Sequence, residues 1–411
     1  MKYILNFLLL FLGTLTCFSQ QKTLDEYLQQ AITNSPLLKD LNNQILSAQL
    51  DSVRIRAGFK PQVIASSAGL YAPVVNGYGY SQAITNGQSI NGLITVSKSF
   101  IGKNYLNAQF AGIGFQQDSL RNNIKLSEQD LRRTIIAQYV TAYGSLQQQA
   151  FNQEIVDLLS KEEDLLKRLT RSNVYRQSDY LTFLVTLKQA QLQLSQARLQ
   201  YKTDYATLNY LSGLADTTVL AIAKPDLQRK IVQRPDNSIF FRQYRLDSLR
   251  LDNTRKLIDY SYKPRLSVFG DGGYNSDLTG QYYKNFGASL GFAVSLPIYD
   301  GGYRKLQYKK LSLEQDTRRT YQAFFNNQYS QQISQLNQQI SDYDQLIGQI
   351  NDQFKYSESL IKVDTKLLQT GDLKIADLIL AINNYLSVRN LLTQNTISRL
   401  QLINQLNYWS R

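Results

Sequence analysis

LRNNIKLSEQDLRRTIIAQYVTAYGSLQQQA, residues 120–150, lies in the middle of a segment, 103–172, that contains no proline. Its apolar residues recur at spacings of four and seven, which keep one stripe on one face of a helix. The stripe comprises Leu120, Ile124, Leu131, Ile135, Tyr139, Leu146 and Ala150. At about 1.5 Å per residue, a single helix over 103–172 would be roughly 105 Å long. That length exceeds an ordinary domain and indicates an elongated assembly.

The chain carries a second copy of this element. Val96-Ser97 and Val294-Ser295 are 198 residues apart, as are Asp179 and Asp377, and the offset persists to the end of the chain. Lys60-Pro61 and Lys263-Pro264 are 203 apart, which places a short insertion in a tolerant loop of the first copy. We therefore predict a tandem duplication that forms one composite body.

The predicted organisation follows from this register. We expect a signal peptide at 1–19. A first repeat at 20–225 would contain an opening helix, strands at 62–71 and 88–100, a long helix at 103–172 and a helix at 177–212. A second repeat at 226–411 would contain an opening helix, strands at 265–274 and 285–297, a long helix at 303–369 and a helix at 374–409.

Composition removes most routes to catalysis. The chain of 411 residues has no His, its only Met is Met1 and its only Cys is Cys17. A Ser/His or Cys/His nucleophile, a Cys/His zinc set and a thioether metal path are therefore excluded, and we expect neither enzymatic activity nor a cofactor or bound metal. The net charge of +13 makes nucleic-acid binding conceivable, but the N-terminus argues against it.

The N-terminus has the pattern of a secretory signal peptide. Met1-Lys2 is positively charged, Ile4 to Leu12 is mostly apolar, and Cys17-Phe18-Ser19 ends in a small residue. Cleavage after Ser19 is favoured over lipid attachment at Cys17, because Thr14 and Thr16 stand where a lipoprotein site has Leu and a small residue. No later apolar run is long enough for a transmembrane helix.

The period changes from helical to alternating after each Lys-Pro. The clearest case is Phe286–Leu296, where apolar residues alternate with small or polar ones. Such alternation suits a transmembrane strand with lipid on one side and water on the other, and equally a half-buried soluble sheet. Four strands per chain cannot close a barrel, and lipid does not tolerate open strand edges, so a membrane barrel would need strands from several chains.

Several motifs in order make the chain resemble the TolC-like outer membrane factor family. They are Ser295–Gly302 (SLPIYDGG), a Lys-Pro before each first strand, Thr23–Leu28 (TLDEYL) with Asn34–Pro36, and Gly371–Leu378 (GDLKIADL). The resemblance covers the whole mature chain. Two departures are that Ser97–Gly102 lacks the full turn motif and that Arg176–Ser178 lacks a counterpart of Gly371.

The resemblance implies a mixed α/β membrane protein. Three copies would pool four strands each into one transmembrane β-barrel, and the long helical hairpins would form a periplasmic α-helical barrel. The family are exit ducts of tripartite efflux or type I secretion systems in the Gram-negative outer membrane. The implied partners are two further copies, outer membrane lipid, a periplasmic adaptor and an inner membrane transporter, with no nucleic acid. The alternative is a secreted trimeric coiled-coil stalk with a small β-head, such as an adhesion protein.

The resemblance also places candidate site residues at the two hairpin turns, which in the family lie at the end of the tunnel far from the membrane. Asp377 matches a position that lines the gate, and Asp179 is its internal equivalent. Both could instead cap the N-terminus of the following helix. Val174, Tyr175, Gly371 and Asp372 are candidates for contact with the adaptor, or form ordinary hairpin turns.

Overall fold

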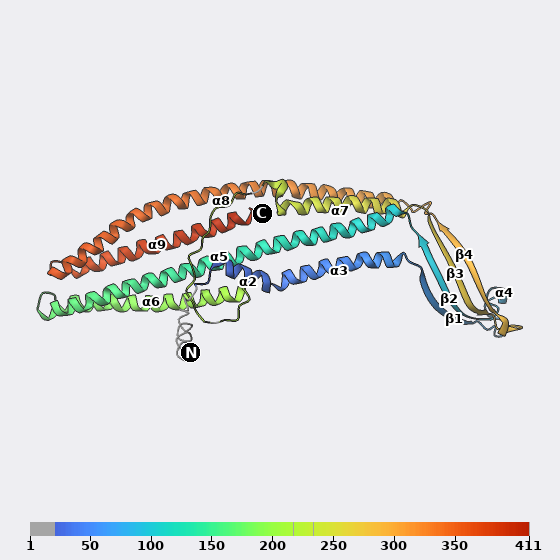
Figure 1. Ribbon diagram of the computed structural model, residues 1–411, viewed down its shortest axis with the longest axis horizontal. Coiled ribbons are helices and arrows are strands. Elements are labelled where there is room, and N and C mark those ends of the chain that lie inside the picture. The colour runs from blue at the N-terminus through green and yellow to red at the C-terminus, as the bar shows by residue number, and fades with distance from the viewer. Residues whose placement is uncertain (1–20, 217, 233, 411) are drawn as a thin grey trace, which may run out of the picture. The chain divides into compact units, whose positions relative to one another are not determined.

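The computed structural model describes residues 21–216, 218–232 and 234–410 (Figure 1). The signal peptide expected at 1–19 lies outside the described residues. The chain forms two compact units: the first contains the described residues of Met1–Leu38, Lys125–Ser238 and Asn326–Arg411, and the second contains Lys39–Ile124 and Ile239–Phe325. Each unit draws on both predicted repeats, so the repeat boundary between 225 and 226 stays a prediction.

Most of the described chain is helical. The helices are α2 (Leu24–Asn34), α3 (Pro36–Gly58), the short α4 (Gln82–Thr85), α5 (Lys103–Arg171), α6 (Gln177–Leu211), α7 (Ile239–Ser261), α8 (Tyr303–Thr370) and α9 (Ile375–Tyr408). The first of them begins with a capping box: Glu26 N donates to Thr23 Oγ1 at 3.4 Å, and Thr23 N donates to Glu26 Oε2 at 3.2 Å. The two proline-free segments each form one uninterrupted helix, α5 and α8.

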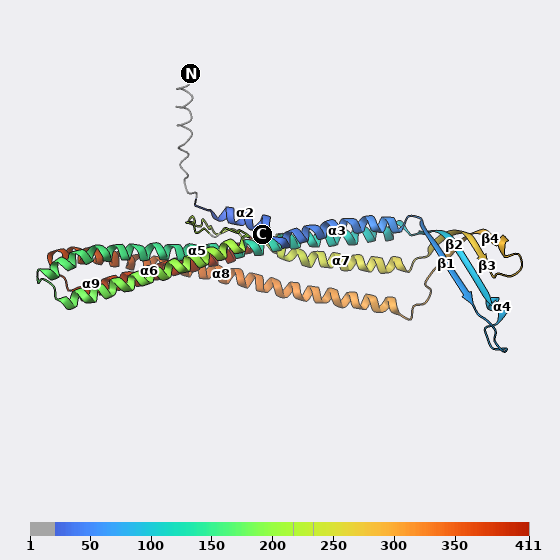
Figure 2. The same ribbon diagram turned by 90° about the horizontal axis from the view of Figure 1, so that it is seen from below.

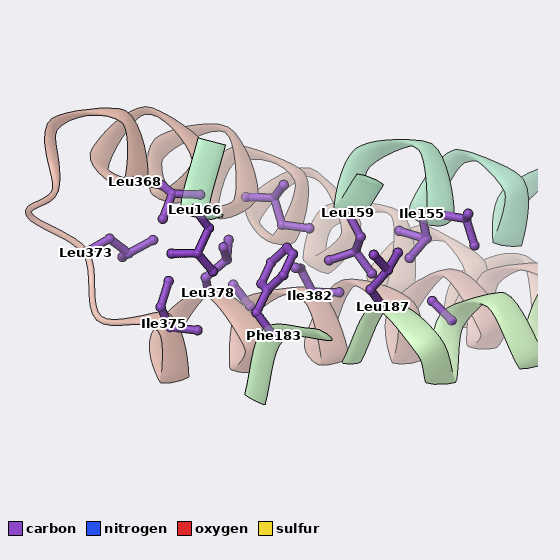
Figure 3. Close-up of a cluster of buried hydrophobic side chains, with 14 of the residues drawn as sticks. Ile155, Leu159, Leu166, Phe183, Leu187, Leu368, Leu373, Ile375, Leu378 and Ile382 are labelled. Atoms are coloured by element: carbon purple, nitrogen blue, oxygen red, sulfur yellow. The ribbon is translucent and has the colours of Figure 1, made fainter. Parts of the chain in front are cut away.

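The first unit is built from two helical hairpins, α5–α6 and α8–α9, whose second helices α6 and α9 lie side by side (Figure 2). A hydrophobic cluster fills the space between the four helices near the hairpin turns (Figure 3). Its members include Phe151, Ile155, Leu159, Leu166, Phe183, Leu187, Leu368, Ile375, Leu378 and Ile382. The apolar stripe of each helix is therefore used to pack helices against one another over a narrow seam.

The second unit contains a four-stranded antiparallel sheet in the order β1-β2-β3-β4. Its strands are β1 (Gln62–Tyr71), β2 (Gln88–Phe100), β3 (Arg265–Ser276) and β4 (Phe286–Ser295). The central pair joins strands from the two halves of the chain, with Val96 opposite Gly270. Within the described chain, β1 and β4 are each paired on one side only, so both outer edges of the sheet are open.

The sheet has two chemically different faces. Residues directly opposite in antiparallel strands share a face, and neighbours along a strand alternate between faces. By this register one face, here called the apolar face, carries Val63, Ala65, Tyr71, Ile90, Ile94, Val96, Phe100, Leu266, Val268, Tyr274, Phe286, Ala288, Leu290, Phe292 and Val294. On the opposite face Ser289 Oγ donates to Asp271 Oδ2 at 2.9 Å.

The alternation is clean in β4 and weaker in β1. In β1, Ile64 and Leu70 lie on the same face as Gln62 and Ser66. On the apolar face of β4, Leu290 is 92% exposed and Phe292 is 74% exposed. In the described part of the chain, no helix is both long enough and apolar enough to cross a bilayer.

Candidate functional site

The turn between α5 and α6 ends α5 with a left-handed residue. Asn173 has φ +60°, its N–H donates to Thr170 O at 3.1 Å, and the N–H of Val174 donates to Leu169 O at 2.9 Å. This pair of bonds is the Schellman motif, which satisfies the last carbonyl groups of a helix.

The turn between α8 and α9 is built in the same way. Gly371 has φ +81° and donates to Leu368 O at 3.2 Å, and Asp372 N donates to Leu367 O at 3.1 Å. Every member of this motif lies 198 residues after its counterpart in the first turn. The counterpart of Gly371 is therefore Asn173, not a residue of Arg176–Ser178, because asparagine tolerates the left-handed conformation that glycine adopts freely.

The two turns contact each other through Tyr175. Its hydroxyl donates to Leu373 O at 2.8 Å, and only 9% of the residue is exposed. Burial raises the pKa of Tyr175 above its ordinary value, and the bond to Leu373 offsets part of that rise. A Cβ atom on Gly371 would lie 2.8 Å from Val174 Cγ1, so the turns are also closely packed there.

The four residues predicted to contact an adaptor are therefore not equivalent. Val174 is half-exposed and Asp372 is exposed, whereas Tyr175 is buried between the turns and Gly371 is partly covered. In this structure Val174 and Asp372 form the outer surface of the turns, and Tyr175 and Gly371 hold them together.

The two candidate gate acids also differ. Asp179 is half-buried, and its Oδ2 accepts the N–H of Arg176 at 3.3 Å, which caps the start of α6. Asp377 occupies the matching position in the first turn of α9 but is exposed, and no described residue donates a hydrogen bond to its side chain. Asp179 has a capping role, and Asp377 presents its charge to the surroundings.

Two further carboxylates near the turns were not among the predicted site residues. Asp364 on α8 is 7% exposed and Glu162 on α5 is 4% exposed. Burial raises the pKa of Asp364, the charge of nearby Asp377 raises it further, and burial also raises the pKa of Glu162. The sequence feature that could have predicted a buried carboxylate is an acid at a position of the apolar stripe. Asp364 is such an acid, because it lies at helical spacing between Ile361 and Leu368.

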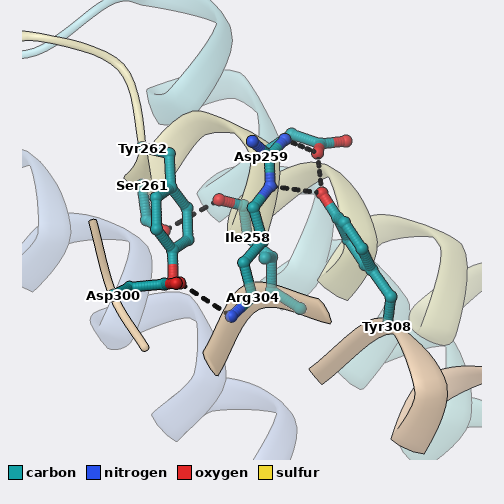
Figure 4. A network of polar contacts seen from close by, with 7 residues as sticks. All are labelled: Ile258, Asp259, Ser261, Tyr262, Asp300, Arg304 and Tyr308. Carbon is teal, nitrogen blue, oxygen red and sulfur yellow. Dashed lines mark hydrogen bonds and ion pairs between the residues drawn. The ribbon is translucent and has the colours of Figure 1, made fainter. Parts of the chain in front are cut away.

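A polar network connects the segment between β4 and α8 with the first turns of α8 and the end of α7 (Figure 4). Asp300 accepts the N–H groups of Gly302 and Arg304 at 2.9 and 2.8 Å and the hydroxyl of Tyr262 at 2.5 Å. The Tyr262 hydroxyl and the Arg304 N–H hold the pKa of Asp300 below its ordinary value. Gly301 and Gly302 both have positive φ, so the Asp-Gly-Gly sequence is an N-terminal cap for α8.

The network continues to α7. Arg304 Nη2 donates to Asp259 Oδ1 at 2.7 Å, and the hydroxyl of Tyr308 donates to the same oxygen. At the matching positions of the first strand–helix junction, the Arg56 guanidinium lies 5.1 Å from the centre of the Phe110 ring. The second junction is therefore held by hydrogen bonds where the first uses a cation–π contact.

Comparisons with known proteins identify the fold. Neither protein-family models nor curated proteins gave a match. Among solved structures, the outer membrane protein VceC from Vibrio cholerae is 12% identical with a TM-score of 0.73, and the match covers 94% of this chain and 96% of that chain. The open state of the MtrE outer membrane channel from Neisseria gonorrhoeae is 13% identical with a TM-score of 0.72, covering 94% and 88%.

A membrane protein from Pseudomonas aeruginosa is 13% identical with a TM-score of 0.75, covering 94% of this chain and 90% of that chain. Similarity of this kind, with so few identical residues, establishes a common fold. The predicted combination of long helical hairpins with a four-stranded sheet is confirmed.

Proposed function

We propose that this chain, which has the fold of the TolC-like outer membrane factors, is the subunit of a passive channel through the outer membrane. Three copies would pool their four-stranded sheets into one closed transmembrane barrel. Their helical hairpins would form a tunnel in the periplasm. The channel would complete a tripartite efflux or type I secretion system with a periplasmic adaptor and an inner membrane transporter, which supplies the energy.

The observation that carries this proposal is the sheet with two open edges and one apolar face. An open edge leaves backbone N–H and C=O groups unpaired, which lipid does not tolerate, so pairing of β4 of one copy with β1 of the next would satisfy both edges. The exposed apolar side chains of β4 then face lipid, and Asp271 and Ser289 face the aqueous lumen.

The same arrangement gives the turns a role in gating. In a trimer, three copies of Asp377 would surround a narrow lumen and attract cations. Its exposure and the lack of a capping bond support this role. For Asp179 the hydrogen bond from Arg176 favours capping, so its contribution to a six-fold ring is the weaker part of the proposal.

The exposed residues of the turns are the proposed contact with the adaptor. Val174 offers an apolar side chain that is 50% exposed, and Asp372 offers an exposed carboxylate. Tyr175 and Gly371 would act by keeping the two turns in register, through the bond to Leu373 and the close approach to Val174.

The test is planar-bilayer conductance of the detergent-extracted protein, measured together with its mass in detergent. We expect discrete conductance steps from a particle with the mass of three chains. A soluble trimer without conductance would instead identify a secreted coiled-coil stalk with a β-head.

A further inference from the structure

A groove crosses the apolar face of the sheet at two glycines of β3, which carry no side chain. Gly270 and Gly272 lie on this face of β3, between Ile94 and Val96 of β2 and Ala288 and Leu290 of β4. The structure has a cavity of about 750 Å³ that these residues line together with Lys98. The volume is that of a pocket for a small ligand, and the wall is mostly apolar.

Lys98 is the only charged residue on the apolar face of the four described strands. By register it lies opposite Val268, and its ammonium group is 5.2 Å from the centre of the Phe100 ring. By register no carboxylate shares this face with it: Asp271, which also lines the cavity, belongs to the opposite face, where it accepts the hydroxyl of Ser289. A cation with no opposite charge on its own surface is suited to an anion supplied from outside the protein.

The position of Lys98 along β2 determines how deep it would lie in the membrane. It is two residues before the end of β2 at Phe100, where the chain turns into α5 at Lys103. Two residues of strand correspond to roughly 7 Å, less when the strand is tilted, and a lysine side chain extends by several ångströms toward an interface. The ammonium group can therefore reach the level of lipid headgroups while its methylene chain stays beside the groove.

We propose that the groove holds one acyl chain of an anionic glycerophospholipid and that Lys98 binds the phosphate of its headgroup. Gly272 leaves room for the chain, because a Cβ there would have only ordinary contacts, whereas the side chain of Leu290 lies over Gly270. Ile94, Val96 and Leu290 provide apolar walls, and Lys98 supplies the charge complementarity at the end nearest the helices. The inference rests on the proposed function, because only a sheet that spans a membrane presents this face to lipid.

The experiment compares binding of dioleoylphosphatidylglycerol and dioleoylphosphatidylcholine to the detergent-purified full-length protein by native mass spectrometry. We expect the wild type to retain the anionic lipid preferentially. Lys98→Gln should lower its retention roughly fivefold, the factor for one cation near an anionic surface, whereas Lys98→Arg should keep it.

A second pair of variants tests the groove. Gly272→Val should lower the retention of both lipids, because a Cβ there has only ordinary contacts, the nearest at 3.8 Å, and the larger side chain fills the groove without strain. Gly92→Val is the matched control: Gly92 lies on the same face, a Cβ there meets nothing within 4 Å, and the residue does not line the cavity.

Conductance of the same samples separates the two proposals. Equal retention of both lipids by all variants, in protein that conducts, would overturn the lipid site alone. Displacement of phosphatidylglycerol by an equal concentration of inorganic phosphate would also overturn it, because the acyl chain in the groove would then add nothing to binding. A wild type that neither conducts nor binds lipid would overturn the channel as well.

Discussion

The replacement of Phe292 by lysine tests whether the apolar face of the sheet contacts lipid. Phe292 lies on β4 and is 74% exposed in the single chain, so most of its side chain would contact lipid in the assembled barrel. The substitution removes this contact. Removing a phenylalanine from an apolar environment costs about 1–2 kcal/mol at this exposure. A lysine on the lipid face costs about 2–4 kcal/mol at the bilayer midplane but only about 0–1 kcal/mol near an interface, and by register Phe292 lies in the same row as Lys98, near the end of the strands. We therefore expect a loss of about 1–3 kcal/mol per subunit, three times over in a trimer.

The assay is the fraction of the protein recovered as a trimer from outer membranes, followed by the conductance of the extracted protein. The matched control is Ala293→Lys, because Ala293 is the next residue on β4 and lies on the opposite face, across from Ser267. We expect Phe292→Lys to assemble poorly and Ala293→Lys to assemble normally with an altered ion preference. Equal assembly of the two variants, or a defect confined to Ala293→Lys, would refute the assignment of the faces.

Three further predictions concern the hairpin turns. Gly371→Ala should lower the free energy of unfolding by about 1–2 kcal/mol, because alanine is strained at φ +81° and its Cβ would lie 2.8 Å from Val174 Cγ1; chemical denaturation measures the loss, and the added Val174→Ala should restore part of it. Because burial raises the pKa of Asp364, its contribution to stability is present at low pH and is lost as the pH rises through the folded-state pKa, so Asp364→Asn should flatten the decline in melting temperature as the pH rises above about 4, the ordinary pKa of an aspartate; an unchanged decline would contradict this cause. Asp377→Asn should weaken the cation preference of single channels more than Asp179→Asn does, and an unchanged preference in both would count against gating by these acids.

The junction network explains a motif that the sequence offered only by resemblance. The Asp-Gly-Gly sequence at Asp300 to Gly302 is needed because two consecutive residues adopt positive φ and the carboxylate accepts two backbone N–H groups. In the first half, Gly102 occupies the position that matches Asp300, so that junction has no equivalent carboxylate cap. The departure at Ser97–Gly102 therefore reflects a junction with a different chemistry.

Local pattern was sufficient to predict the secondary structure. The proline-free segments with an apolar stripe form α5 and α8, and the strands begin and end within two residues of the predicted bounds. These features depend on residues close in sequence: helical spacing, alternation, and proline or glycine at the ends. The register of 198 residues pairs Asn173 with Gly371, but the left-handed conformation that these two residues share came from the structure.

Contacts between distant segments could not be obtained in this way. Three features depend on segments that are far apart in the sequence. They are the pairing of β2 with β3, the hydrogen bond from Tyr175 to Leu373, and the burial of Asp364 by neighbouring helices. A single sequence does not show which surfaces contact one another. The burial of a residue depends on what packs against it, and the face that a strand residue occupies depends on the register of the partner strand. The alternating pattern in β2 determined that Lys98 shares a face with Val96, but only the assembled sheet placed it at the end of a groove left open at Gly272.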